Sequence, residues 1–177
     1  VVEERIVVHE PSFLEQAVKP EPVEEFKPAP FVAKPAARST KLARVFTVAP
    51  ASGGCGKTFY ATNFAAYLAK ATGGRVLLVD LDPQANSSIS FVDHTAIGRS
   101  TYDAIAETEC RLADIILPAN AQPNLFIAPG RIPLAKLEAR LVGEMDAHFR
   151  LKDKIDQLSG EYAHIVGSSF LGALLFL

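Results

Sequence analysis

A glycine-rich segment constrains the fold of this chain more than any other feature, because it lies where a strand passes directly into a helix. Residues 52–58 read Ser-Gly-Gly-Cys-Gly-Lys-Thr. The apolar, β-branched run Arg44–Ala49 before it predicts a short buried strand. Residues 58–71 after it predict a helix. The side chains at helical spacing on one face of that helix are Tyr60, Phe64, Tyr67, Leu68 and Ala71.

A second apolar run indicates a parallel sheet. Residues 75–80 read Arg-Val-Leu-Leu-Val-Asp and follow the helix-ending pair Gly73-Gly74. Near-continuous apolar strands are typical of parallel sheets, whose two faces are both covered. A strand, a helix and a strand within about 36 residues form a βαβ unit, and its crossover should be right-handed.

Strands and helices continue to alternate along the rest of the chain. The expected elements are a short helix from residue 101, a short helix over 112–117, a strand over 124–128, a helix over 134–158 and a strand over 162–166. Ser100 and Asp103 have the spacing of a capping box at the first of these helices. This order predicts a layered α/β domain.

Composition divides the chain into two unequal parts. Residues 1–40 hold six of the twelve prolines and none of the eleven glycines, which predicts an extended, flexible tail. The alternative for this part is a segment that docks onto a partner through its few apolar residues. Residues 41–177 carry the recurring apolar runs and form the predicted folded domain.

Charge, cysteine content and apolar run length exclude several classes of protein. The formal net charge is −2, which is not the strongly basic balance of many nucleic-acid-binding proteins. Two cysteines, Cys55 and Cys110, cannot build a disulfide framework, so a reducing, cytoplasmic location is expected. No apolar run reaches the roughly 18 residues of a membrane-spanning helix. The four histidines share no metal-ligand spacing.

The residues of the glycine-rich segment suit it to bind phosphate. Glycines allow backbone N–H groups to converge on phosphate oxygens, and the helix that follows points its positive end at the same anion. Lys57 can supply a positive charge to the phosphates, and the Thr58 hydroxyl can bind Mg²⁺. The alternative is a strand-to-helix turn that binds no ligand.

Two carboxylates follow the second strand. Asp80 and Asp82 lie at the carboxyl end of that strand, where α/β sheets bind their ligands. The alternative is a polar end to the strand without a binding role.

Three segments together resemble the ParA family of deviant Walker A ATPases, whose relatives include MinD and the pilus-assembly CpaE/TadZ proteins. They are Gly53–Thr58, Ala61–Ala65 and Val76–Asn86. The resemblance covers residues 44–162 and implies a P-loop NTPase-like three-layer sandwich with a mostly parallel sheet.

The resemblance also implies a ligand and a set of site residues. The ligand is ATP with Mg²⁺, held between the two subunits of a homodimer. Lys57 and Asp82 take the catalytic roles, with Lys57 gripping phosphate and Asp82 orienting the attacking water. Thr58 binds the Mg²⁺ ion and Asp80 supports its coordination shell. The nucleotide-binding residues are Gly53, Gly54, Cys55, Gly56, Lys57, Thr58 and Phe59. In partition ATPases the ATP-bound dimer binds DNA, and a ParB-like partner stimulates hydrolysis.

Three departures from the family pattern lower the expected activity. Ser52 stands where the family has a signature lysine that reaches the partner subunit's nucleotide. No acidic residue follows Glu161, although the family has one at the end of a later strand. The family continues beyond the stretch matched here, so we expect its C-terminal part to be missing. The chain also begins at Val1, has Met145 as its only methionine and ends in an apolar run, so we expect it to be truncated at both ends.

These observations predict a ParA-type ATPase of chromosome or plasmid partitioning with weak or lost hydrolysis and weak DNA binding. Two alternatives stay open. One is a non-hydrolysing nucleotide-binding localisation scaffold of the CpaE/TadZ type. The other is an inactive gene fragment.

Overall fold

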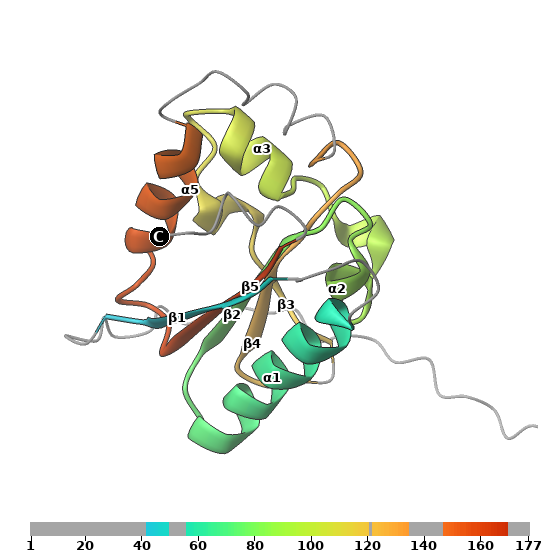
Figure 1. The fold of residues 1–177 in the computed structure, drawn as a ribbon, viewed down its shortest axis with the longest axis vertical. Helices are drawn as coiled ribbons and strands as arrows, with labels where there is room; N and C mark the ends of the chain where they lie inside the picture. The colour runs from blue at the N-terminus through green and yellow to red at the C-terminus, as the bar shows by residue number, and fades with distance from the viewer. Residues whose placement is uncertain (1–41, 50–55, 121, 135–146, 170–177) are drawn as a thin grey trace, which may run out of the picture. The chain divides into compact units, whose positions relative to one another are not determined.

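The computed structural model describes residues 42–49, 56–120, 122–134 and 147–169. Within them, five strands form one sheet in the order β1-β5-β2-β4-β3 (Figure 1). The strands are β1 Arg44–Val48, β2 Val76–Leu81, β3 Leu117–Pro118, β4 Leu125–Ala128 and β5 His164–Ser169. β1, β5, β2 and β4 run parallel, and β3 pairs with β4 in the antiparallel sense.

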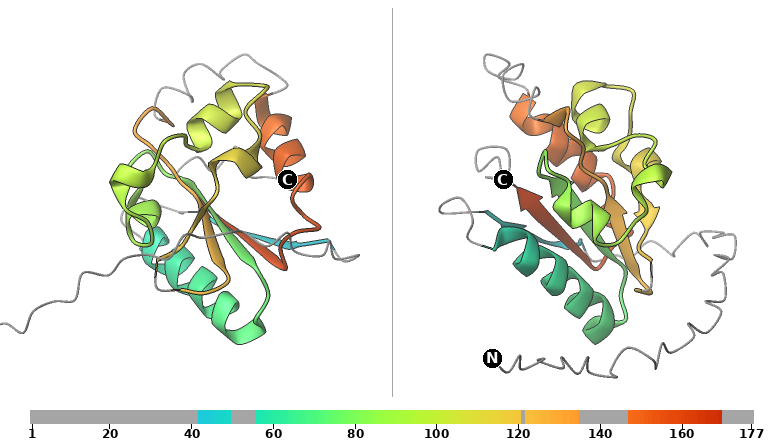
Figure 2. Two further views of the ribbon diagram at one scale, coloured as in Figure 1. Left: turned by 180° about the vertical axis from the view of Figure 1, so that it is seen from behind. Right: turned by 90° about the vertical axis from the view of Figure 1, so that its right-hand side faces the viewer.

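Helices cover both faces of the sheet, which confirms the predicted α/β sandwich. Figure 2 shows α1 on one face and α3 and α5 on the other. The helices are α1 Lys57–Thr72, α2 Asn86–Ile89, α3 Thr101–Ala106 and α5 Ala147–Asp156, and short 3₁₀ turns lie at His94–Ala96 and Leu112–Ile115. None of the helices in this part of the chain is long and apolar enough to cross a membrane.

β2 is the centre of the core, as its apolar run predicts. All six of its residues are buried. Because side chains alternate along a strand, Leu77, Val79 and Leu81 pack with α3 and α5, whereas Val76 and Leu78 pack with α1. The core is therefore split into two clusters by the strand that also carries Asp80.

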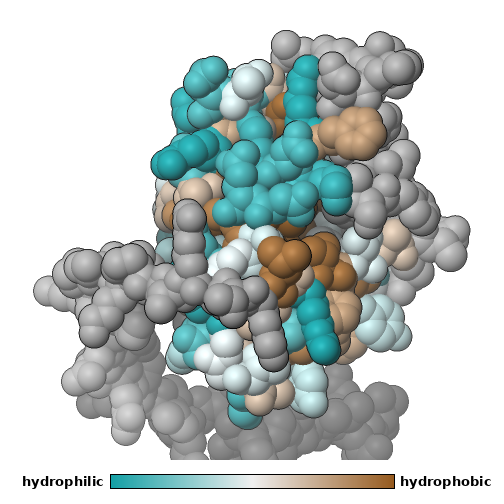
Figure 3. All heavy atoms as spheres, turned by 90° about the vertical axis from the view of Figure 1, so that its left-hand side faces the viewer, coloured by the Kyte–Doolittle hydropathy of each residue, from teal (hydrophilic) through white to brown (hydrophobic). Residues whose placement is uncertain are grey.

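The expectation that the first strand is buried is wrong. β1 pairs only with β5 in the described sheet, and Val45 is 51% exposed. Figure 3 shows apolar side chains exposed on this side of the molecule. An apolar run identifies a strand, but only the order of strands decides whether both of its edges are covered.

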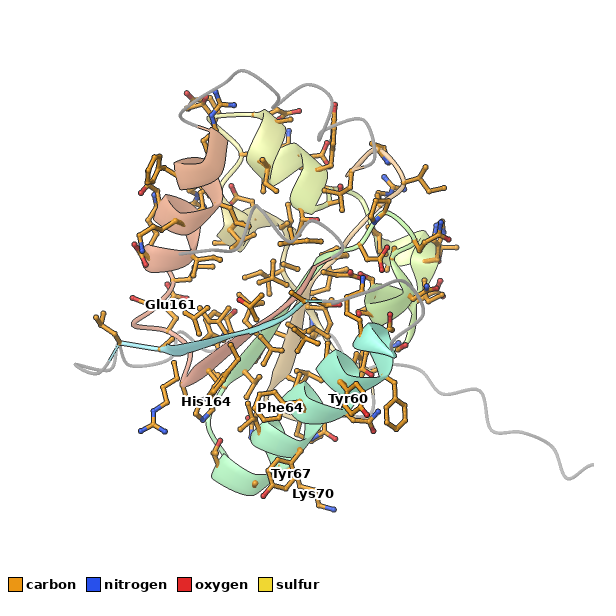
Figure 4. All side chains as sticks on the ribbon, in the orientation of Figure 1. Tyr60, Phe64, Tyr67, Lys70, Glu161 and His164 are labelled. Carbon is orange, nitrogen blue, oxygen red and sulfur yellow. The ribbon has the colours of Figure 1, made fainter. Side chains whose placement is uncertain are left out.

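The side chains that share helical spacing on α1 differ in burial, since Leu68 is buried and the two tyrosines are not. Tyr60 and Tyr67 are 62% and 65% exposed, whereas Phe64, labelled with them in Figure 4, is partly buried and packs against the core. The buried side chains are Lys57, Ala61, Thr62, Ala65, Leu68 and Ala69. Small side chains let the helix lie close to the sheet.

Most of the other predicted elements are confirmed, with shifted ends. Gly73 ends α1 in the left-handed conformation, with φ 65°. At the start of α3 the Asp103 carboxylate accepts a hydrogen bond from the Ser100 N–H at 2.7 Å. The second short helix is wrong beyond residue 115, since Leu117–Pro118 form the edge strand β3. The tail over residues 1–40 and much of the helix over 134–158 lie outside the described residues.

Lys154 on α5 joins the two elements that cover one face of the sheet. Its ammonium group donates to the main-chain oxygens of Ala104, of Cys110 at 2.7 Å, of Glu107 at 2.8 Å and of Thr108 at 3.4 Å. These carbonyls lie at the end of α3 and just beyond it, where a positive charge is favourable. Burial lowers the pKa of Lys154 below its usual value.

Replacing this ammonium group should weaken the fold. We expect Lys154→Met to lower the free energy of unfolding by about 1–3 kcal/mol, because several carbonyls lose a charged donor. The control is Lys152→Met, which breaks only an exposed ion pair with Asp156 at 3.8 Å and should cost less than about 0.5 kcal/mol. Urea unfolding measures both, and equal losses would contradict the assignment.

Candidate functional site

The carboxyl ends of the parallel strands and the first turn of α1 meet at one edge of the sheet. Asp80 lies at the end of β2 and is opposite Ser168 of β5 in the strand register. Lys57 is the first residue of α1. This edge is where doubly wound sheets bind ligands, because the loops that leave neighbouring strands separate there.

Gly56 brings the chain into the helix in a conformation that favours glycine. It is the N-cap of α1, with φ 77° and ψ 18°, and its carbonyl accepts the Tyr60 N–H at 3.0 Å. A residue with a side chain is strained in this left-handed region. Gly53, Gly54 and Cys55 lie outside the described residues.

Lys57 and Asp82 form a buried ion pair. The Lys57 ammonium donates to Asp82 Oδ2, and each side chain is 9% exposed. The other carboxylate oxygen of Asp82 accepts the Gln84 N–H at 2.9 Å, and its carbonyl accepts the Ala85 N–H at 2.9 Å. Lys57, which is expected to bind phosphate, therefore lies beside Asp82, the carboxylate that is expected to orient the attacking water.

Asp80 is fully buried, and both of its carboxylate oxygens accept hydrogen bonds from the chain. Oδ1 accepts the Asp82 N–H at 3.0 Å. Oδ2 accepts the Ser88 N–H at 2.8 Å and the Ser88 hydroxyl at 2.7 Å. Burial raises the pKa of Asp80 above its usual value, although these hydrogen bonds act in the opposite direction.

Three residues that sequence reasoning missed complete this arrangement. Ser88 Oγ accepts the Gly130 N–H at 2.9 Å, and the Thr101 hydroxyl donates to the Asp80 carbonyl at 2.8 Å. They come from α2, from the segment after β4 and from the start of α3. No local pattern marks them, because they meet Asp80 only through the tertiary fold.

A protein-family profile described as AAA domain (AAA_31) matches residues 43–169. The chain belongs to this family. It is 32% identical to the sporulation initiation inhibitor protein Soj of Bacillus subtilis over 126 residues, and this alignment covers 71% of this chain and 49% of Soj. It is also 32% identical over 126 residues to the chromosome partitioning protein ParA of Myxococcus xanthus, of which it covers 44%. The chain thus spans about half the length of these curated relatives, and its resemblance to ParA-type P-loop ATPases is confirmed.

Solved structures of the same fold agree with this assignment. Cobyrinic acid a,c-diamide synthase from Mycobacterium smegmatis, crystallised with ADP and magnesium, matches with a TM-score of 0.67 and 28% identity over 75% of this chain and 54% of that chain. A plasmid partition protein from Borrelia burgdorferi matches with a TM-score of 0.63 and 25% identity over 76% of this chain and 59% of that chain.

Within this ParA-like fold, hydroxyl groups occupy the end of β5. Ser168 is fully buried, and its Oγ lies 3.2 Å from Ser87 Oγ. This is the stretch in which the sequence shows no acidic residue. In the described part of the AAA_31 domain, no group of three or more His, Cys, Asp or Glu side chains is arranged to hold a metal ion.

The described members of the expected nucleotide-binding set differ in exposure. Lys57 points to Asp82, and Thr58 follows it in the first turn of α1 with a partly exposed side chain. The Phe59 side chain is 66% exposed and packs edge to face on Tyr60, with ring centroids 5.7 Å apart. If Phe59 contributes to binding, it does so from the surface of the helix.

Gly130 has no room for a side chain at this site. A Cβ there would lie 2.9 Å from the Asp82 carbonyl oxygen and 3.0 Å from the Asp80 carbonyl oxygen. We expect Gly130→Ala to lower the free energy of unfolding by about 1–3 kcal/mol through overpacking. Gly98→Ala is the control, because a Cβ at Gly98 meets nothing within 4 Å. Thermal unfolding compares the two, and an equal midpoint for both variants would contradict the close packing.

Proposed function

We propose that this chain is the nucleotide-binding part of a ParA-type partition ATPase and that it binds ATP with Mg²⁺. The observation that carries the proposal is the buried Lys57 ammonium group at the start of α1, beside Asp82 at the end of β2. A buried lysine that donates to a carboxylate at a helix N-terminus is suited to exchange that carboxylate for a phosphate. The relatives named above support the choice of ligand.

The residues present fit this group. The backbone N–H groups of Gly53, Gly54, Cys55 and Gly56 would surround the phosphates, and Lys57 would neutralise their charge. The Thr58 hydroxyl would bind Mg²⁺. Asp80 would support the metal site indirectly, because both of its carboxylate oxygens already accept hydrogen bonds. Bound Mg²⁺ supplies positive charge against the developing negative charge of phosphoryl transfer. Asp82, released from Lys57, would hold the attacking water.

Phosphate binding should depend on Lys57. We expect wild-type protein to bind Mg·ATP in titration calorimetry and Lys57→Ala to bind at least about 100-fold more weakly, because a charged phosphate contact is worth about 3 kcal/mol. Lys70→Ala is the matched control, since Lys70 is an exposed lysine in the last turn of the same helix. Equal affinities of wild type and Lys57→Ala would overturn the proposal.

The second candidate function is a nucleotide-binding scaffold without hydrolysis, of the CpaE/TadZ type. The observation that favours it is the Ser87–Ser168 hydroxyl pair at the end of β5, a strand whose sequence contains no acidic residue. Ser52, in place of the family's signature lysine, points in the same direction. We also propose a homodimer, a ParB-like partner and a cytoplasmic location, which the ParA resemblance supports. DNA binding is proposed to be weak, because the chain is near neutral.

Hydrolysis separates the two candidates. We expect phosphate release at background level, because a charge supplied across a subunit interface is worth about 10³ to 10⁵ in rate. Ser52→Lys alone should not restore turnover, since the sequence also lacks the acidic residue that the family has at the end of a later strand. A chimera that adds the C-terminal half of a ParA relative to Ser52→Lys should recover it. Clear turnover by the unmodified chain would reject the scaffold.

A further inference from the structure

We propose that Asp80 is a positioning residue that, with Ser88 and Gly130, holds Asp82 against Lys57 and so sets how tightly the site binds phosphate. The proposal rests on the function proposed above, because it assigns Lys57 to the nucleotide. It departs from a direct metal-binding role for Asp80. The described contacts around this carboxylate lead to it in three steps.

First, both carboxylate oxygens of Asp80 accept hydrogen bonds from groups of the protein itself. Its three hydrogen bonds come from the N–H of Asp82 and from the N–H and hydroxyl of Ser88, at 2.7–3.0 Å. The Asp82 main chain is therefore fixed by the residue two positions before it. Losing these donors would leave a buried carboxylate without hydrogen bonds, at a large cost in free energy. The donors belong to Asp82 and Ser88, so this cost restrains the conformation of residues 82–88.

Second, Ser88 links this segment to the chain just after β4. The Gly130 N–H can only donate, so Ser88 Oγ is its acceptor at 2.9 Å, and the hydroxyl hydrogen is free to bond Asp80 Oδ2. The missing side chain of Gly130 lets its backbone approach, since a Cβ would lie 3.2 Å from Asp80 Cγ. The position of Asp82 thus depends on contacts from after β2 and after β4.

Third, Asp82 competes with phosphate for Lys57. Both side chains of the ion pair are 9% exposed, so their attraction is weakly screened. A phosphate that binds Lys57 has to displace this carboxylate or accept a second negative charge beside it. Loosening the contacts that fix Asp82 should therefore tighten nucleotide binding, which is the opposite of what general damage to a binding site does.

The experiment is a double-mutant cycle read by calorimetry with Mg·ATP. In the wild-type background we expect Ser88→Ala to tighten binding by roughly three- to tenfold, and Asp82→Asn to tighten it by roughly tenfold. In the Asp82→Asn background, Ser88→Ala should have no further effect. The control is Ser90→Ala, which removes an exposed hydroxyl bonded to the Asn86 carbonyl and should change neither background.

The same cycle contains the results that overturn the proposal. Weaker binding by Ser88→Ala, or an equal change in both backgrounds, would show that Ser88 acts without Asp82. Asp80→Asn, which keeps the shape but only one acceptor oxygen, should shift affinity in the same direction as Ser88→Ala. A change in the opposite direction would also reject the positioning role.

Amide hydrogen exchange on nucleotide-free protein tests the contacts independently. Ser88→Ala should speed exchange of the Asp82 and Gly130 amides while leaving residues 151–155 of α5 unchanged. Unchanged exchange at both amides would overturn the positioning role even if nucleotide binds as expected. Absence of Mg·ATP binding by the wild type would instead reject the proposed function, and the exchange result would still decide the role of Asp80.

Discussion

The arrangement of the whole site depends on one buried carboxylate. Asp80 lies near the end of β2, a strand whose residues are all buried, so water cannot satisfy it. The chain meets this demand with donors from the segment after β2 and from α2, and it ties α2 in turn to the segment after β4. Because an unsatisfied buried carboxylate is expensive, these segments are constrained together.

Charge balance explains how the site can exist before a ligand arrives. Asp80 and Asp82 lie two residues apart at the end of the same strand, and Lys57 at the start of α1 pairs with Asp82. In a poorly solvated site, the same lysine can stabilise either Asp82 or a phosphate. The two anions therefore compete for Lys57, and binding of one weakens the interaction of Lys57 with the other. The strength of the ion pair therefore bears on function as well as on stability.

The two exposed apolar regions have different physical origins. β1 is open because it lies at the edge of the described sheet, with Val45 half exposed. The aromatic side of α1 is open because the helix uses alanines to approach the sheet, and Phe64 is only partly covered by Phe46, at a ring distance of 5.2 Å. Neither exposure alters the edge of the sheet where Lys57, Asp80 and Asp82 meet.

The sequence by itself determined the strand, turn and helix around residues 44–72, the parallel β2 strand, the α3 capping box and the choice of Lys57, Asp80 and Asp82. These follow from local rules of periodicity, capping and glycine conformation that act over a few residues. Tertiary structure alone decided which face of α1 is buried, that β1 is an edge, and that Ser88, Thr101 and Gly130 surround Asp80. Such contacts join residues 8, 21 and 42 positions apart, and they depend on how strands order and helices pack rather than on any local pattern.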